Sequence, residues 1–440
     1  MLRRKILQQL RDWRDSDAHK SLIISGARQI GKTYIVREFG KEYTSFIELN
    51  FLEEPELKQI FEVNLDADAI LMGIRLNRPR QTLVEGETLL LLDEIQECPN
   101  AITALKFLAK DTRVDTVATG LALGMTYNRI TSYPVGYVDY LDMYSLDFEE
   151  FLDAMGIDAD VLVYVKKHFE DRTPVEPAVH QKMMQYLRQY LVIGGMPEIV
   201  DCFVKQQDYV AADTIQRRIY RDYLADIARF AKPADKLKAE KCYRSIPAQL
   251  MKQNHKFQYS IVEKKGTTRK FESSLDWLET AHMIIPVMNV GYVEYPLLAH
   301  EISDQVRVYP SDTGLLIAAY DFSLKQAILQ DGESNIENGV VLKTAKGGLY
   351  EALIAGMLQK AGYKNLHFYR NEAGTAEIEF LIDGPSDTIP IEVKAGRSRA
   401  RTLDNLLKKE DISCGIKLAN QNVGIDGKKV TLPLYMAMWL

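Results

Sequence analysis

The chain has 440 residues, of which 46% are hydrophobic and 26% are charged, and its formal net charge is −6. This composition is that of an ordinary globular protein with about two to four domains, and it excludes a surface that is basic throughout. The four cysteines lack CxxC spacing, so we expect no zinc site and no disulfide framework, and a reducing cytoplasmic compartment fits. No apolar run approaches the length of a membrane span, so no membrane partner is expected.

Residues 1–20 are predicted to form one basic amphipathic helix, which leads into a short buried strand, Leu22–Ile24. The strand ends at a full match to GxxxxGK[ST], and a predicted helix, Lys32–Phe39, follows it. Glycines let backbone N–H groups converge on phosphate oxygens, a lysine adds a cation, and a threonine hydroxyl can bind Mg²⁺. The predicted ATP-binding residues are therefore Gly26, Ala27, Arg28, Gln29, Ile30, Gly31, Lys32, Thr33 and Tyr34.

The second half of this predicted site ends another apolar strand, Thr88–Asp93. Asp93 is expected to bind Mg²⁺ together with Thr33. Glu94 is the predicted catalytic residue, because a carboxylate beside the metal can polarise the attacking water. A glycine-rich turn and an acidic turn each occur by chance, but the two patterns in this order predict a nucleoside triphosphatase site with ATP and Mg²⁺ as cofactors.

Further strands are predicted at Ser45–Asn50, Thr116–Gly120 and Gly136–Ser145, with helices at Leu65–Asn77 and Ala101–Lys110 between them. Alternating strands and helices predict an α/β fold with a parallel sheet that helices cover on both faces. In such sheets ligands bind at the carboxyl ends of the strands, where both nucleotide motifs lie. We expect a P-loop ATPase core over residues 1–147 and a helical lid over 148–205, packed beside the nucleotide and broken at Gly194-Gly195 and Pro197.

The charge changes sign in the third expected part, residues 206–305. Between Lys232 and Lys270, eleven Lys and Arg residues stand against three acids. Short helices followed by a β hairpin favour a winged helix, a fold that places a helix in a DNA groove. DNA is therefore a candidate partner of residues 232–270. The alternatives are a solvated basic face or a surface that docks on the acidic ATPase part.

The fourth expected part, residues 306–440, carries a second acidic pattern. Two predicted hairpin strands, Glu377–Asp383 and Ile389–Lys394, bring Glu379 close to Glu392 and Lys394. Two carboxylates and a lysine in this arrangement are typical of a metal-dependent nuclease, and Glu351 on a preceding helix completes the candidate set. The alternative is a structural strand that carries Glu and Lys on its solvent face.

With these motifs in hand, the chain resembles a prokaryotic family of AAA-type ATPases that joins an ATPase module to a C-terminal domain of unknown function. The resemblance extends over nearly the whole chain. It rests on GARQIGKT, LLLLDEIQECP, the TG after the fourth strand, YPVGYVDYLDMYSLDFEEFL, GGMPEIV, SDTGLL and IPIEVKAG. It implies that the ATPase module binds ATP with Mg²⁺. It also implies a C-terminal part with a winged helix and a nuclease-like fold of the PD-(D/E)xK type.

Three positions depart from the family's pattern. Leu121 replaces a serine that follows the TG in relatives, which leaves Thr119 as the candidate sensor of the γ-phosphate. Tyr137 stands where relatives often carry arginine, so no arginine finger is assigned. Glu379 replaces the usual aspartate, and its extra methylene shifts the carboxylate of the nuclease-like site.

These patterns lead to one first interpretation and two alternatives. The first is an AAA-type ATPase that couples Mg-ATP binding and hydrolysis to C-terminal interaction domains. The second is an ATP-gated DNA-binding protein or nuclease. The third is a nucleotide-bound, non-enzymatic scaffold whose C-terminal half binds a protein partner. Stimulation of turnover by DNA separates the second interpretation from the third.

Overall fold

The computed structural model describes residues 2–120, 134–230, 235–252, 255–330, 340–385, 387–394 and 400–440. Leu121, Lys232 and the last two residues of IPIEVKAG lie outside these ranges. The chain divides into two compact units: Arg3–Tyr144 with Thr280–His282, and Leu2, Ser145–Glu279 and Met283–Leu440. The division into four parts at residues 147, 205 and 305 is finer than this one and stays a prediction.

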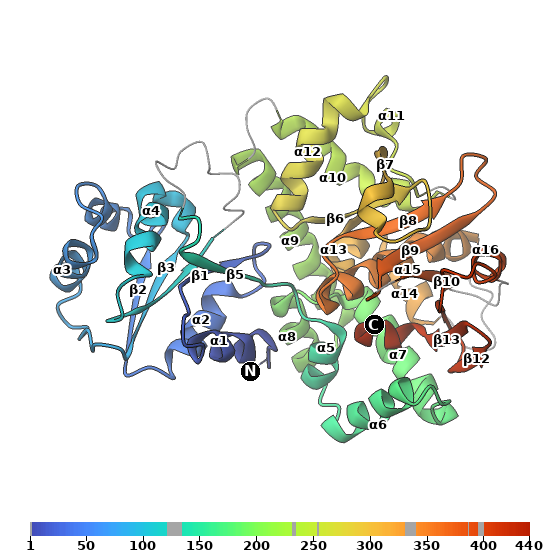
Figure 1. The fold of residues 1–440 in the computed structure, drawn as a ribbon, viewed down its shortest axis with the longest axis horizontal. Coiled ribbons are helices and arrows are strands. Elements are labelled where there is room, and N and C mark those ends of the chain that lie inside the picture. The colour runs from blue at the N-terminus through green and yellow to red at the C-terminus, as the bar shows by residue number, and fades with distance from the viewer. Residues whose placement is uncertain are drawn as a thin grey trace. The chain divides into compact units, whose positions relative to one another are not determined.

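The first unit is built on a five-stranded sheet, in the order β2-β3-β4-β1-β5, whose neighbours all run parallel (Figure 1). The strands are β1 (Ser21–Ser25), β2 (Ser45–Asn50), β3 (Thr88–Asp93), β4 (Asp115–Thr119) and β5 (Val138–Asp142). The predicted α/β fold with a parallel sheet is thereby confirmed. Because β3, β4 and β1 are neighbours, their carboxyl ends meet at one edge of the sheet.

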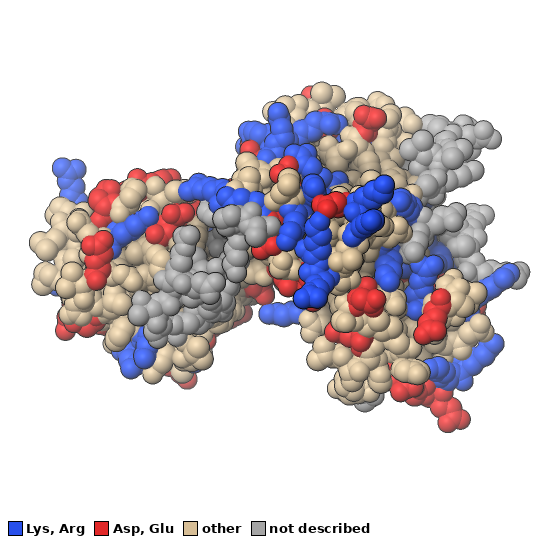
Figure 2. Space-filling view, turned by 90° about the horizontal axis from the view of Figure 1, so that it is seen from above, with Lys and Arg blue, Asp and Glu red and all other residues tan. Residues whose placement is uncertain are grey.

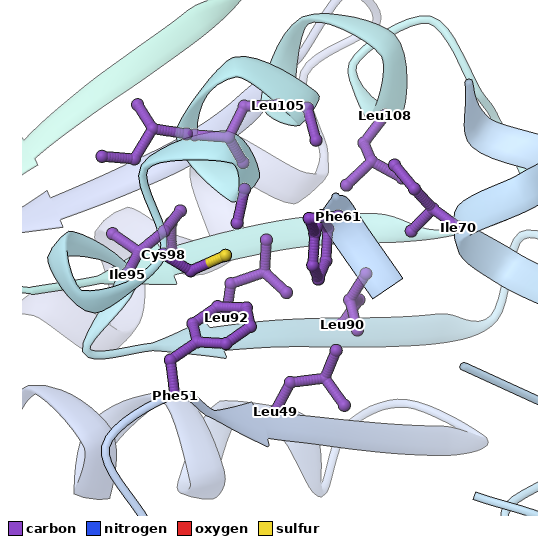
Figure 3. Close-up of a cluster of buried hydrophobic side chains, with 14 of the residues drawn as sticks. Leu49, Phe51, Phe61, Ile70, Leu90, Leu92, Ile95, Cys98, Leu105 and Leu108 are labelled. Atoms are coloured by element: carbon purple, nitrogen blue, oxygen red, sulfur yellow. The ribbon is translucent and has the colours of Figure 1, made fainter. Parts of the chain in front are cut away.

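Helices cover both faces of this sheet. They are α1 (Ile6–Arg14), α2 (Lys32–Gly40), α3 (Ala67–Asn77) and α4 (Pro99–Leu108), with a 3₁₀ turn, η1 (Pro55–Phe61). On one face, Leu90 and Leu92 of β3 pack in a buried cluster with Phe61 and with residues of α3 and α4 (Figure 3). Side chains alternate along a strand, so Leu89 and Leu91 point to the other face, where α2 contacts β2, β3 and β4.

The first helix is shorter than predicted. It spans Ile6–Arg14 rather than residues 1–20. Asp15, Ser16 and Asp17 follow it, and such residues favour turns because their side chains compete with the helix for backbone hydrogen bonds. The expectation of one helix up to Lys20 was therefore wrong.

The second unit contains an eight-stranded mixed sheet in the order β12-β13-β11-β10-β9-β8-β6-β7. The strands are β6 (Ile284–Val290), β7 (Glu301–Pro310), β8 (Leu366–Arg370), β9 (Glu377–Asp383), β10 (Thr388–Lys394), β11 (Gly415–Ala419), β12 (Gly424–Asp426) and β13 (Lys429–Pro433). The predicted hairpin of β9 and β10 is antiparallel, and β10 pairs in parallel with β11.

The helices around this sheet include the segment predicted as a lid. They are α5 (Phe148–Ala154), α6 (Ala159–Glu170), α7 (Pro177–Ile193), α8 (Pro197–Gln206), α9 (Tyr209–Phe230), α13 (Thr313–Ala318), α14 (Phe322–Leu329), α15 (Val340–Ala361) and α16 (Arg401–Leu406). The break between α7 and α8 falls at the predicted glycine pair. Helix α7 contacts α13, α14 and α15, so this segment packs on C-terminal elements of the second unit.

The basic segment forms three helices ahead of the β6–β7 hairpin, namely α10 (Lys236–Leu250), α11 (Tyr259–Val262) and α12 (Thr268–Thr280). Lys256, between α10 and α11, pairs with Arg307 of β7. Strand β6 also pairs in parallel with β8, so the hairpin belongs to the larger sheet. Across the described residues, no helix is long and apolar enough to cross a membrane.

Candidate active site

The predicted phosphate loop joins β1 to α2 and depends on two glycines. Gly26 has a φ of +152°, and a Cβ there would lie 2.2 Å from the carbonyl oxygen of Met143. Gly31 precedes α2 with a φ of 90°, in the left-handed region. Only glycine fits both positions without strain, so the backbone conformation explains why the motif has glycine at these two positions.

The side chains of the loop point to different surroundings. Lys32 Nζ donates to the carbonyl oxygens of Gly26 (2.8 Å) and Ala27 (2.7 Å), so the ammonium lies across the loop. Ile30 is buried in the core. Gln29 has a positive φ of 60°. Tyr34 is 46% exposed at the start of α2, where an aromatic ring is accessible to a bound ligand.

Thr33 and Asp93, the two predicted magnesium ligands, lie next to each other. Thr33 Oγ1 is 3.1 Å and 3.0 Å from the two carboxylate oxygens of Asp93, although 60 residues separate them in sequence. Thr119 Oγ1 also donates to Asp93. A hydroxyl and a carboxylate are the oxygen donors that Mg²⁺ prefers, so this chain's residues fit the metal.

Asp93 is buried at the end of β3, and its partners in the described structure are neutral. They are the hydroxyls of Thr33 and Thr119 and the side-chain amide of Asn50, whose Nδ2 lies 3.1 Å from Oδ2. Burial raises the pKa of Asp93 above its ordinary value, the negative charge of Glu94 adds to the rise, and the two hydroxyls oppose it. A cation that binds here from outside would stabilise the ionised carboxylate.

Glu94 follows Asp93 in the left-handed region, with a φ of 51°. Gln96 Nε2 donates to its carboxylate, and Arg28 Nη2 lies 3.9 Å from Glu94 Oε2. A non-glycine residue in this backbone region is uncommon and is enriched where geometry serves a site. The turn thus separates the two neighbouring carboxylates: one stays buried among hydroxyls, and the other faces Arg28 of the phosphate loop.

Sequence reasoning missed two residues that support the loop. Asn50 ends β2, and its Oδ1 accepts from the backbone N–H groups of Leu52 and Glu53, so its amide is held against Asp93. A polar residue at the end of a predicted strand was a usable signal. Arg4 donates to Ile30 and Tyr144, and nothing in the local sequence indicates those contacts.

The second acidic pattern also forms a cluster. Lys394 Nζ lies 2.9 Å from Glu379 Oε1 and 2.9 Å from Glu392 Oε1. Glu379 Oε2 accepts from the backbone N–H of Val393, whereas the buried Glu392 Oε2 has no hydrogen-bond partner among the residues that the structure describes. Both carboxylates are buried, so the alternative of a strand with a solvent-facing Glu and Lys does not hold.

The buried charges of this cluster shift the pKa values of Glu379 and Lys394. Burial raises the pKa of Glu379 to about 7, against the opposing charge of Lys394, and the neighbouring Glu351 and Glu392 add to the rise. Burial alone would lower the pKa of Lys394, but the two carboxylates raise it above its usual range. The cluster therefore holds one cation between two acids in a low-dielectric interior.

Glu351, the fourth residue of the candidate set, has other partners. Its Oε2 lies 2.7 Å from His255 Nδ1, 2.8 Å from the Tyr309 hydroxyl and 3.5 Å from Arg307 Nη1. Burial would raise the pKa of Glu351, but these partners lower it to about 2. Among the residues that the structure describes, no three His, Cys, Asp or Glu side chains are placed to hold a metal ion.

The basic segment is exposed at the turn between α11 and α12. Figure 2 shows Lys and Arg side chains gathered on the second unit, and Lys264, Lys265, Arg269 and Lys270 are among the exposed residues. The next turns of α12 are acidic. Burial and mutual repulsion raise the pKa values of Asp276 and Glu279, which line a cleft of about 180 Å³ with Glu272 and Glu301. Along α12, basic residues therefore lie at the amino end and acidic residues on the later turns.

Comparison with known families gives three matches along the chain. Residues 18–152 match the model of the AAA domain family. Residues 184–326 match a domain of unknown function (DUF8612), and residues 346–436 match another (DUF4143). No curated protein matches the chain. Together with the parallel sheet and the phosphate loop, the first match supports a P-loop AAA ATPase domain.

Solved structures that match the chain include a Walker-type ATPase of Pyrococcus abyssi, at 12% identity and a TM-score of 0.43, covering 72% of this chain and 96% of that chain. The ORC1 protein of Aeropyrum pernix in complex with DNA is 11% identical with a TM-score of 0.28, covering 75% and 91%. Cdc6p from Pyrobaculum aerophilum is 12% identical with a TM-score of 0.24, covering 74% and 93%. Likeness at these scores carries no argument about function.

Proposed function

We propose that this protein binds ATP with Mg²⁺, hydrolyses it, and couples nucleotide state to its C-terminal domains. The observation that carries the proposal is the meeting of Lys32, Thr33 and Asp93 at the carboxyl edge of a parallel sheet. Mg²⁺ supplies charge neutralisation for the phosphates when it is bound. The chain supplies the binding groups and the carboxylate that acts on water.

Each residue has a distinct proposed task. The loop Gly26–Thr33 directs backbone N–H groups and the Lys32 ammonium to the phosphates, while Thr33 and Asp93 hold the metal. Glu94 orients and polarises the attacking water, and Arg28 lies close enough to influence that carboxylate. Thr119, the last residue of β4, is hydrogen-bonded to Asp93, so changes at the metal are transmitted to that strand. Tyr34, beside the loop, is placed to contact the nucleotide.

Calorimetric ATP binding and steady-state turnover test this proposal on the intact chain and on Lys32→Ala. Loss of the phosphate-directed cation is expected to weaken binding by about 100-fold or more, since charge-assisted hydrogen bonds are lost. Lys41→Ala is the matched control, because the exposed Lys41 follows the same helix and its ammonium pairs with Glu38 on the helix surface. Equal ATP affinity in Lys32→Ala and Lys41→Ala would overturn the proposal.

A second candidate function, metal-dependent cleavage of DNA, is favoured by the Glu379, Glu392 and Lys394 cluster. Its specific support is the buried Glu392 Oε2, a carboxylate oxygen that has no hydrogen-bond partner in the described part of the chain and that a metal ion would satisfy. Glu379 stands where a shorter acid is usual, and Mg²⁺ demands near-octahedral geometry. We therefore expect the intact chain to cleave DNA poorly.

Plasmid nicking in Mg²⁺ and in Mn²⁺ tests this second candidate. Small errors of position at a reacting centre cost ~10²-fold, so nicking is expected to rise in Glu379→Asp and to disappear in Lys394→Ala. If no variant nicks DNA in either metal, the cluster is structural. Robust Mg²⁺-dependent cleavage by the unmodified chain would instead make DNA cleavage the main activity.

DNA binding itself is tested at the basic turn. If Lys264 and Lys265 contact phosphates, replacing both with Glu should weaken binding, and the affinity of the intact chain should fall steeply with salt. Lys408→Glu with Lys409→Glu is the matched control, because it makes the same charge change on another exposed part of the second unit. Flat salt dependence would favour a protein partner. Turnover stimulated by DNA would exclude the non-enzymatic scaffold.

A further inference from the structure

Arg4 is a buried arginine in a unit whose other cations mostly face solvent. It lies just before α1 and is 8% exposed. Its Nη1 donates to the carbonyl oxygen of Ile30 (3.1 Å), and its Nη2 donates to that of Tyr144 (2.7 Å). Burying a guanidinium is costly unless hydrogen bonds satisfy it, so the two carbonyl contacts are a specific feature of this position.

The contact with Ile30 fixes a peptide group of the phosphate loop. In a planar trans peptide the C=O of one residue and the N–H of the next point in opposite directions. The carbonyl of Ile30 and the N–H of Gly31 belong to one such group. When Arg4 holds the carbonyl on the protein side of the loop, the N–H of Gly31 is directed to the opposite side. Backbone N–H groups of this loop are the ones that bind phosphate oxygens.

The contact with Tyr144 anchors the arginine from the other side. Met143 N–H donates to the carbonyl of Ser25 (2.8 Å), and the Ser25 hydroxyl donates to Asp142 (2.6 Å). Residues 142–144 therefore continue along β1 beside the loop. Because both sides of the guanidinium are bound to backbone that is itself fixed, Arg4 has little freedom to release Ile30.

We propose that Arg4 is a positioning residue of the ATP site, which holds the Ile30 carbonyl so that the Gly31 N–H faces the nucleotide's phosphates. The inference rests on the proposed function, because it concerns the same loop. Arg4 does not touch the nucleotide. Its loss acts on phosphate binding, and the carboxylates that act on water keep their places.

The test compares ATP affinity, KM and kcat in the full chain and in Arg4→Met, Arg4→Lys and Arg3→Met. Arg4→Met is expected to raise the Kd and KM for ATP by about tenfold or more, with kcat at saturation nearly unchanged, since a charged donor to a buried carbonyl is lost. Lysine keeps the cation but not the fork of two donors, so Arg4→Lys should recover part of the affinity. Arg3 is the exposed neighbour, and Arg3→Met should behave as the unmodified chain.

The outcomes separate the two claims. If the unmodified chain binds no ATP, the proposed function fails. If it binds ATP and all Arg4 variants bind equally well, only the positioning role of Arg4 fails. If Arg4→Met does not fold, Arg4→Lys decides: an unchanged KM overturns the inference, and a raised KM with an intact thermal transition supports it. A fall in kcat without a change in KM would also overturn it, because it would place Arg4 in the chemical step.

Discussion

The two acidic sites of this chain differ in where their positive charge comes from. In the first unit, the buried carboxylate of Asp93 receives hydrogen bonds from Thr33, Thr119 and Asn50, all of them neutral. In the second unit, Lys394 lies 2.9 Å from both Glu379 and Glu392 and neutralises them from within the chain. The first site is suited to accept a cation from outside, whereas the second already holds one.

This difference explains why similar residue types predict different chemistry. Burial raises the pKa of Asp93, and the positive charge of an incoming Mg²⁺ would lower that pKa again. At the second site a metal ion would have to displace or share the Lys394 ammonium before it reached two carboxylate oxygens. The first unit is therefore the better candidate for fast turnover, and four predictions test this contrast.

The largest effect is expected at Glu94. Removing a group that polarises water typically costs ~10²–10⁴ in rate, so Glu94→Gln should turn over ATP that much more slowly while binding it normally. Single-turnover hydrolysis and calorimetric binding measure the two quantities separately. Glu97→Gln is the matched control, because Glu97 lies in the same turn and pairs with Lys58 at 3.8 Å. Normal turnover in Glu94→Gln would assign the water-activating role to another residue.

The next effect is on stability, at Lys394. Removing the cation of a buried ion cluster leaves two uncompensated carboxylates, which costs ~3–5 kcal/mol in comparable cases. Denaturant unfolding of Lys394→Met should show this loss, and adding Glu379→Gln and Glu392→Gln should restore most of it. Lys417→Met on β11 is the control, since Lys417 donates an exposed hydrogen bond to Gln421. An unaltered unfolding curve for Lys394→Met would mean that the cluster is solvated.

The ATPase fold was accessible from the sequence because its signals are local. Strands β2, β3 and β9 begin and end where the apolar patterns predict, and the phosphate loop is set by two glycines of fixed spacing. Strands β11 and β13 were missed, although β1 and β4 are equally short. The phosphate loop that follows β1 and the alternation of strands with helices around β4 gave signals that the segments of β11 and β13 lack.

The candidate sites follow the same rule. Lys32 and Asp93 could be named from motifs, but the contacts of Arg4 span 26 and 140 residues and have no local signature. Likewise, the sequence placed Glu351 with the nuclease-like pair, and its charge does act on Glu379, but the contacts of its carboxylate with His255, Arg307 and Tyr309 could not be predicted. Partners of a buried charge depend on how separate elements pack, which spacing along the chain does not report.

A smaller effect is expected at Asn50, which holds Asp93 without touching the nucleotide. Groups that orient a metal ligand typically contribute 10–100-fold to metal affinity, so Asn50→Ala should need about tenfold more Mg²⁺ for half-maximal turnover. Asn64→Ala is the control, because Asn64 lies in an exposed loop and contacts Asp66. An equal Mg²⁺ requirement in both variants would limit Asn50 to capping the turn at Leu52 and Glu53.

The smallest expected effect is a pH dependence that the two units share through different histidines. Burial lowers the pKa of His19, but the neighbouring Asp115 outweighs this effect and raises the pKa above its ordinary value. In the same way, burial lowers the pKa of His255, but Glu351 raises the pKa of this histidine above its ordinary value. A histidine with a raised pKa in the folded state stabilises that state fully below the unfolded pKa of about 6.5, and the contribution is lost as pH rises through the folded pKa. Glu351, with a pKa lowered to about 2, stays ionised throughout this window.

Thermal unfolding between about pH 5 and 8 should therefore show stability falling as the pH rises. His19→Gln should flatten the slope of the first unit, because it removes the titrating partner of Asp115. His255→Gln should only reduce the slope of the second unit, because the contribution of Glu379, with a pKa raised to about 7, is also lost there as the pH rises, whereas the lowered pKa of His180 acts in the opposite direction. Trp13, whose ring lies 4.9 Å from that of His19, reports on the first unit, and the buried Trp277 reports on the second. A slope that persists in the first unit of His19→Gln would show that other groups of that unit titrate on unfolding. A slope that vanishes from both units in one single variant would mean that the two units unfold together.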